Sequence, residues 1–203
     1  HIPHDDVILP DDIQGVRAFG EASSPETLAT VMTRILRRMR QKHAQTLEFM
    51  RLSALKGVTR DGRGAVIYDW FSEFDIPRKT IDFKLGDANT DVPAKCRELL
   101  RYIETNLKGE VKTGVRVLVG PGFWDRLIAH KSVVEAYKYY AATVGLNPMR
   151  QATRQGFTFH GVTFEEYDAT FTLFGGKSEP AFGEKEGTAF PIGTIDTFRT
   201  YLA

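Results

Sequence analysis

The feature that most constrains the fold is an amphipathic stretch from Ser24 to Lys56, which the sequence predicts to be one long helix. Ser23 and Glu26 form an S-x-x-E capping box, and Pro25 suits the first turn. Gly57 favours the left-handed conformation that ends helices. Such a helix would be roughly 50 Å long at 1.5 Å per residue. It would therefore span a domain of ordinary size.

This predicted helix has an apolar side and a basic side when it is wound at 100° per residue. We interpret the apolar side as the face that anchors a domain. The basic side is either a solvated face or a surface against which other chains or nucleic acid lie. The apolar side carries Leu28, Met32, Ile35, Leu36, Met39, Leu47, Met50 and Ala54, and the basic side carries Arg34, Arg37, Arg38 and Lys42.

Composition is that of an ordinary globular protein with one large domain or two small ones. The 203 residues are 42% hydrophobic and 26% charged, and the net charge of +1 gives no global basic field for nucleic acid. One cysteine excludes an intrachain disulfide framework and fits a reducing compartment. No apolar run of membrane-spanning length and no secretory signal is seen. Because the chain starts without methionine, we expect a processed or truncated piece of a longer protein.

The remaining patterns predict helices and strands in alternation, with a polar connection as the likeliest boundary. Asp61-Gly62 is a hairpin turn signal, and His160-Gly161 is a second fold-back point. The expected order is an acidic extended arm (1–20), the long helix (24–56), a hairpin (57–74), a polar connection (77–91), a helix (91–108), a strand (115–119), a helical pattern to 144 that breaks near 130–132, and a β-rich remainder with a polar loop at 175–186.

Glycine-rich turns offer little evidence for phosphate binding. Gly120-Pro121-Gly122 lies between a strand and a helix but lacks the rest of the dinucleotide fingerprint, so a plain turn is the better interpretation. Gly176-Lys177-Ser178 resembles the end of a P-loop, yet Phe171 stands where the leading glycine belongs. We take this second match as chance.

Other candidate chemical groups also have simpler interpretations. His1, His4, Asp5 and Asp6 could mimic a metal site, but an open terminal tetrad is weak evidence. Cys96 lies on the apolar stripe of its helix and is interpreted as a buried hydrophobe. We interpret His43 as a core histidine, and Glu165, Glu166 and Asp168 form an acidic cluster whose neighbours alternate between strand faces. We therefore expect no enzyme and no cofactor.

The order of segments resembles the major capsid protein E family of lambda-like tailed phages and prophages. An acidic arm, Val7-Ile-Leu-Pro-Asp-Asp-Ile-Gln-Gly-Val-Arg-Ala-Phe-Gly20, leads into the long helix, which closes with Met50-Arg-Leu-Ser-Ala-Leu-Lys-Gly57. The hairpin Asp61-Gly-Arg-Gly-Ala-Val-Ile-Tyr-Asp-Trp70 follows. Later segments are Val117-Leu-Val-Gly-Pro-Gly-Phe-Trp-Asp125 and Gly193-Thr-Ile-Asp-Thr-Phe-Arg-Thr-Tyr201. The resemblance covers essentially the whole chain.

The resemblance implies an α+β capsid fold with a spine helix, a peripheral domain and an axial domain. Residues 1–23 would be the trailing part of an extended loop that lies over a neighbouring subunit, and residues 24–86 the peripheral domain, with its spine at 24–56 and its hairpin at 57–75. Residues 87–203 would be the axial domain, without the C-terminal return to the peripheral domain.

The resemblance also implies a structural coat protein of the virion, assembled in the host bacterial cytoplasm. Its partners would be copies of itself in hexamers and pentamers, packaged double-stranded DNA bound non-specifically, and a possible head decoration protein, with no membrane.

The charges of the arm and of the helix predict how two such subunits contact each other. We expect the acidic arm of one subunit to face the basic side of the helix of its neighbour, setting register more than stability. The residues involved would be Asp5, Asp6, Asp11 and Asp12 on the arm and Arg34, Arg37, Arg38 and Lys42 on the helix.

Three alternatives stay open at this point. A nucleic-acid-binding module could use the basic helix, an enzyme could assemble a site from dispersed residues such as His130, Glu165 and Asp168, and a nanocompartment shell could package proteins instead of DNA.

Overall fold

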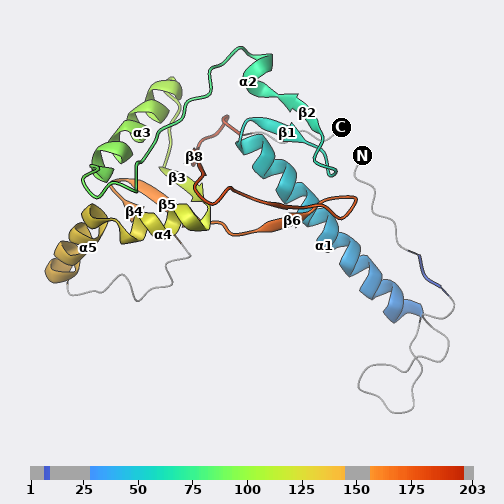
Figure 1. The fold of residues 1–203 in the computed structure, drawn as a ribbon. Helices are drawn as coiled ribbons and strands as arrows, with labels where there is room; N and C mark the ends of the chain where they lie inside the picture. Colours follow the sequence, from blue (N-terminus) through green and yellow to red (C-terminus); the bar gives the residue numbers. More distant parts are fainter. Residues whose placement is uncertain (1–6, 10–27, 145–155, 199–203) are drawn as a thin grey trace. The chain divides into compact units, whose positions relative to one another are not determined.

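The computed structural model describes residues 7–9, 28–144 and 156–198, and these form a mixed helix and sheet structure (Figure 1). The predicted α+β class is therefore confirmed. The chain divides into two compact units: residues 1–73 with 171–178, and residues 74–170 with 179–203. The helices are α1 (Leu28–Leu55), α2 (Trp70–Glu73), α3 (Val92–Asn106), α4 (Pro121–Ala129) and α5 (Lys131–Val144); the strands are β1 (Val58–Arg60), β2 (Val66–Asp69), β3 (Gly114–Val119), β4 (Phe157–Phe159), β5 (Val162–Glu166), β6 (Thr170–Thr172), β7 (Ser178–Pro180) and β8 (Gly187–Ile192).

Helix α1 confirms the long helix from Leu28 onward, and it ends where the sequence predicts. Gly57 has φ +84°, and its N–H donates to Ala54 O at 2.9 Å, so glycine supplies the left-handed stop. The predicted capping residues, 23 to 26, lie outside the described residues.

In the first unit, the two short strands of one hairpin follow the C-terminal end of α1. Strands β1 and β2 pair antiparallel, and Asp61 organises their turn by accepting hydrogen bonds from the N–H groups of Arg63 and Ala65. The distant segment 171–178 also belongs to this unit. Phe171 packs edge-on against Phe49 of α1, with 5.7 Å between ring centroids. The first unit is therefore built from chain segments that include residues more than 100 positions apart.

The second unit is built on a four-stranded sheet in the order β4-β5-β3-β8. Central β3 runs parallel to β5, with Val117 opposite Phe164, and antiparallel to β8, with Val117 opposite Ala189. Three apolar residues in a row at the end of β3 are buried, as expected of a strand covered on both faces.

The core of the second unit is aromatic and aliphatic. Phe164 is fully buried and lies edge-on to Phe83, with ring centroids 6.0 Å apart. Helix α3 contributes Val92, Cys96 and Leu99, and α4 contributes Trp124 and Leu127. Asp91 caps α3 by accepting a hydrogen bond from Ala94 N at 2.9 Å.

Two predicted breaks are confirmed, and one predicted loop is partly wrong. His130 is extended (ψ 135°) between α4 and α5, and the residue pair His160 and Gly161 turns from β4 into β5 with positive φ at both positions. The segment 175–186, however, is not only a polar loop. It contains β7, and its Ala181 and Phe182 are buried, because Phe182 packs edge-on against Tyr167 and Ala181 N–H donates to Ala169 O at 2.7 Å.

No described helix combines the length and the apolar character needed to cross a membrane. The assignment of domains to the capsid architecture stays a prediction.

Candidate functional site

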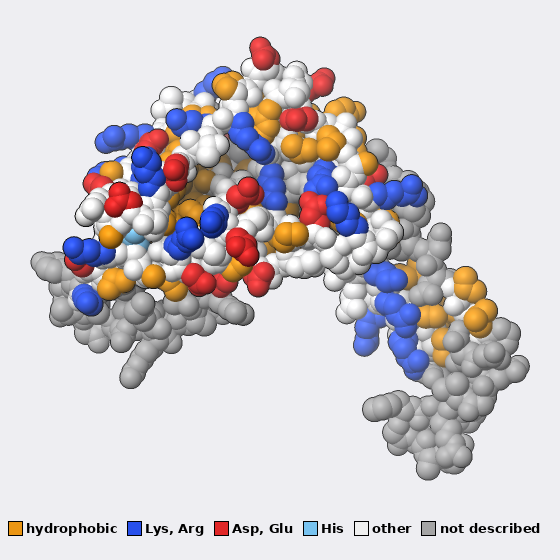
Figure 2. All heavy atoms as spheres, viewed as in Figure 1, with side chains coloured by type: hydrophobic (Ala, Val, Ile, Leu, Met, Phe, Trp, Pro, Cys, Tyr) orange, Lys and Arg blue, Asp and Glu red, His pale blue; other side chains and the backbone are white. Residues whose placement is uncertain are grey.

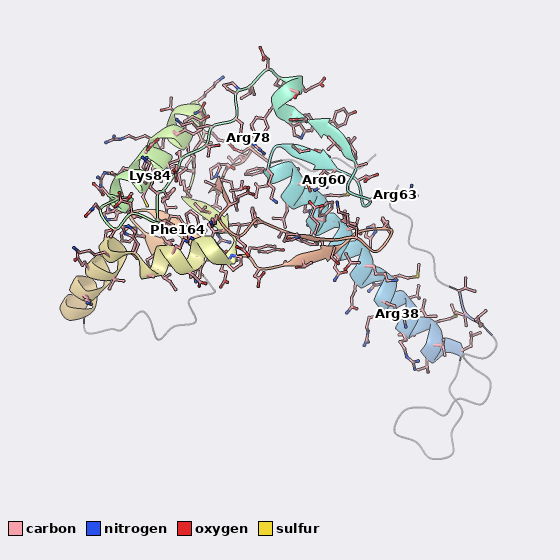
Figure 3. The ribbon with its side chains drawn as sticks, in the orientation of Figure 1. Arg38, Arg60, Arg63, Arg78, Lys84 and Phe164 are labelled. Atoms are coloured by element: carbon pink, nitrogen blue, oxygen red, sulfur yellow. The ribbon has the colours of Figure 1, made fainter. Side chains whose placement is uncertain are left out.

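The basic side of α1 is exposed. Arg34, Arg37, Arg38 and Lys42 are all solvent-accessible, and Lys and Arg side chains gather along one side of this helix in Figure 2. Arg38 projects from α1 in Figure 3. The acidic residues predicted to meet this surface, Asp5, Asp6, Asp11 and Asp12, lie outside the described residues. Their complementarity to the helix therefore stays a prediction.

The apolar side of α1 anchors the unit only in part: Ile35, Met39, Leu47 and Met50 are half-buried, and the sequence interpretation is wrong for the exposed members of this side. Leu28, Met32 and Leu36 are 52%, 44% and 56% exposed. The buried side chains are instead Val31, Phe49, Leu52 and Ser53.

Rotation around the helix explains the difference. At 100° per residue, Phe49 lies about 100° around the axis from Met32. The aromatic contact to Phe171 therefore turns a different side of the helix toward the unit. Leu28, Met32 and Leu36, hereafter the helix stripe, are left as an exposed apolar row with i, i+4, i+8 spacing.

The hairpin carries a second exposed apolar surface that the sequence analysis did not single out. Val66, Ile67 and Tyr68 of β2 are 60%, 49% and 52% exposed, and the adjoining Trp70 is 38% exposed. Neighbouring strand residues point to opposite faces, so Ile67 lies on the other face of the ribbon from Tyr68. We call Tyr68 and Trp70 the hairpin patch. A run that is apolar on both strand faces normally indicates a buried central strand. Here the same run lies in a two-stranded sheet and is exposed.

The turn at Gly120 is occupied by protein backbone. The N–H of Gly120 donates to Glu186 O at 2.9 Å, and the N–H of Phe123 donates to Glu184 O at 2.6 Å. These are donors that a phosphate at a helix N-terminus would need. The plain-turn interpretation is thus confirmed. The Gly176-Lys177-Ser178 match is also explained, because these residues turn between β6 and β7 and begin no helix.

The dispersed enzymatic candidates have structural partners of their own. His130 is buried between Asp87 O (3.0 Å to Nε2) and Ser132 Oγ (2.9 Å to Nδ1), where it ties the α4–α5 break to a loop. Glu165 lies 3.4 Å from the guanidinium of Arg116 on the neighbouring strand, and Asp168 is exposed.

Cys96 is a buried hydrophobe, as predicted. Burial raises the pKa of its thiol to about 12, so thiolate chemistry is suppressed at neutral pH. His43, in contrast, is exposed, so its interpretation as a core histidine is wrong. The part of the chain that the structure describes contains no cluster of three or more His, Cys, Asp or Glu residues arranged to hold a metal. The tetrad at His1, His4, Asp5 and Asp6 lies outside that part.

Comparison with known proteins gives a consistent answer. The sequence model of the family "Phage major capsid protein E" matches residues 1–203. The major capsid protein of Pseudomonas phage KPP10 is 35% identical over 217 aligned residues, which cover 100% of this chain and 62% of that protein. The major capsid protein of Salmonella phage Felix O1 (isolate Felix O1-VT1) is 32% identical over 197 residues, which cover 94% of this chain and 52% of that protein. The chain thus spans less than two thirds of either relative.

Proposed function

This chain belongs to the phage major capsid protein E family, and from that premise we propose that its copies assemble into the icosahedral head shell that encloses phage DNA. The observation that carries the proposal is the family match over every residue of the chain. Two relatives that share about a third of its residues are named major capsid proteins. Imaging the expressed full-length protein for closed shells tests this function.

The exposed surfaces support a role in assembly. A shell subunit must contact several neighbours, so it has to keep specific apolar and charged surfaces outside its own core. The helix stripe, the hairpin patch and the basic side of α1 are surfaces of this kind. A structural role needs no catalytic group, and in this proposal His130, Glu165 and Cys96 serve the fold alone.

The proposal extends to the architecture and the location. Residues 24–86 would be the peripheral domain, with α1 as the spine, and residues 87–203 the axial domain around the symmetry axes of hexamers and pentamers. The partners would be further copies of the chain, packaged DNA and, in some heads, a decoration protein, all within the virion.

Reversing charge on the basic side of α1 is expected to impair assembly in the full-length protein. Arg37→Glu with Arg38→Glu would repel the acidic arm of a neighbour and lower the shell yield about tenfold in 50 mM salt, with partial recovery at 500 mM because salt screens exposed charges. Sedimentation separates shells from free subunits and gives this yield.

The matched control is Arg101→Glu with Lys108→Glu, which reverses two exposed charges at the end of α3. It should assemble as the parent does. Adding Asp11→Arg and Asp12→Arg to the helix variant should restore shells. Normal yield from the helix variant alone would refute the arm–helix contact.

A further inference from the structure

The hairpin patch is held in place although it is exposed. Tyr68 stacks on Trp70, with 5.5 Å between ring centroids, and Trp70 Nε1 donates to Thr59 Oγ1 at 2.9 Å. The N–H of Trp70 also donates to Gly57 O at 3.0 Å, which fixes the strand to the end of α1. Isolated two-stranded hairpins are marginal in water, so this ordering presents a preformed apolar surface.

The helix stripe is an equally preformed surface. Leu28, Met32 and Leu36 follow one another at every fourth position, and Arg40 continues the same row. All four side chains are exposed. An apolar row that ends in a guanidinium fits a partner with apolar side chains beside a carboxylate.

The two surfaces of one chain cannot cover each other. The hairpin is fixed where α1 ends, beyond Leu55, whereas the stripe ends at Leu36. At 1.5 Å per residue, about 28 Å of helix separates Leu36 from Leu55, and about 15 Å separates Leu36 from Thr46, beside which the hairpin turn at Gly62 lies. Because α1 is one continuous helix, the helix stripe and the hairpin patch of the same chain stay apart. The helix stripe therefore does not cover the hairpin patch of its own chain.

Charge makes the two surfaces complementary. Asp69 and Glu73 flank Trp70 in the hairpin patch and are exposed. Most of α1 is basic, because residues 28–47 include Arg34, Arg37, Arg38, Arg40 and Lys42 but no Asp or Glu. An acidic rim around one apolar surface and a basic rim around the other favour pairing of unlike surfaces over pairing of like ones.

We propose that the hairpin patch of one copy docks on the helix stripe of the next copy, with Asp69 and Glu73 facing Arg40. The contact joins different surfaces of identical chains, so it is heterologous and repeats head to tail. Repeated contacts of this kind close into rings when the rotation between copies allows it. The inference rests on the proposed function and names the surfaces that join neighbouring subunits.

Cysteine cross-linking of assembled full-length protein tests the contact. Tyr68→Cys and Leu36→Cys would be introduced into separate chains that carry different tags and are assembled together. A short bismaleimide should then join the two tags in at least half of the pairs available. The native Cys96 does not interfere, since it is buried and its thiol pKa is raised to about 12.

Gln41→Cys is the control for Leu36→Cys, because it is exposed on the same helix but lies about 140° around the axis from Leu36. It should give less than a tenth of the product. A second variant, Tyr68→Asp, should fold with unchanged far-ultraviolet circular dichroism but lose shells at least tenfold. Both results support the docking.

Three results would overturn it. Shells without the 68–36 product, or normal shells from Tyr68→Asp, would reject the docking and leave the proposed function standing. Efficient 36–36 or 68–68 products with no 68–36 product would show that like surfaces meet. Failure of the parent protein to form any shell would overturn the docking together with the proposed function.

Discussion

Replacing Phe164 by Ala is expected to lower the free energy of unfolding of the second unit by about 3–5 kcal/mol, as is usual when a large core aromatic is truncated. Phe164, labelled in Figure 3, is fully buried in β5. Its ring contacts Phe83 and Phe123 at centroid distances of 6.0 and 6.4 Å. Its removal leaves a cavity beneath the strand that pairs with β3.

Urea unfolding measures this loss through the buried Trp124. Replacing Trp70 by Phe in the background removes the other tryptophan of the chain, so the fluorescence reports on the second unit. Val111→Ala, at a side chain that is 75% exposed, should change the free energy by less than about 0.5 kcal/mol. An equally small loss for Phe164→Ala would contradict this description of the core.

Replacing Gly120 by Val is expected to cost about 3 kcal/mol. A Cβ atom at this position would lie within 2.2 Å of Gly183 O, a backbone atom that cannot move aside cheaply. The φ of Gly120 is −73°, which every residue tolerates, so the cost comes from the close approach and not from backbone strain. Displacing the loop would also weaken the hydrogen bonds from the N–H groups of Gly120 and Phe123 to Glu186 O and Glu184 O.

Thermal and urea unfolding of the same chain provide the measurement. Gly86→Ala is the matched control, because nothing lies within 4 Å of a Cβ built there, and it should change the free energy by less than about 0.5 kcal/mol. If Gly120→Val were as stable as this control, the close packing of residues 183–186 over the turn would be wrong.

Local sequence signals predicted most of the secondary structure because each had a physical cause in a few neighbouring residues. Gly57 ended α1 through its positive φ. Cys96 was placed in the core by the period of its helix, and His160 with Gly161 turned β4 into β5.

What the sequence could not predict depended on contacts between distant segments. The side of α1 that is buried depends on the contact between Phe49 and Phe171, and Phe171 lies 122 positions after Phe49 in the chain. The apolar run in β2 could not be assigned to an exposed hairpin from its own residues, because exposure depends on how many strands pair with it. The surfaces that carry the candidate site, the helix stripe and hairpin patch, follow from these same long-range contacts.

The most direct test of the central claim is electron microscopy of the full-length protein after expression on its own and with its natural assembly partners. We predict closed, angular shells of uniform diameter, built from hexamers and pentamers of this chain. A protein that stays monomeric or forms only irregular aggregates in both preparations would contradict the assignment of this chain as a shell subunit.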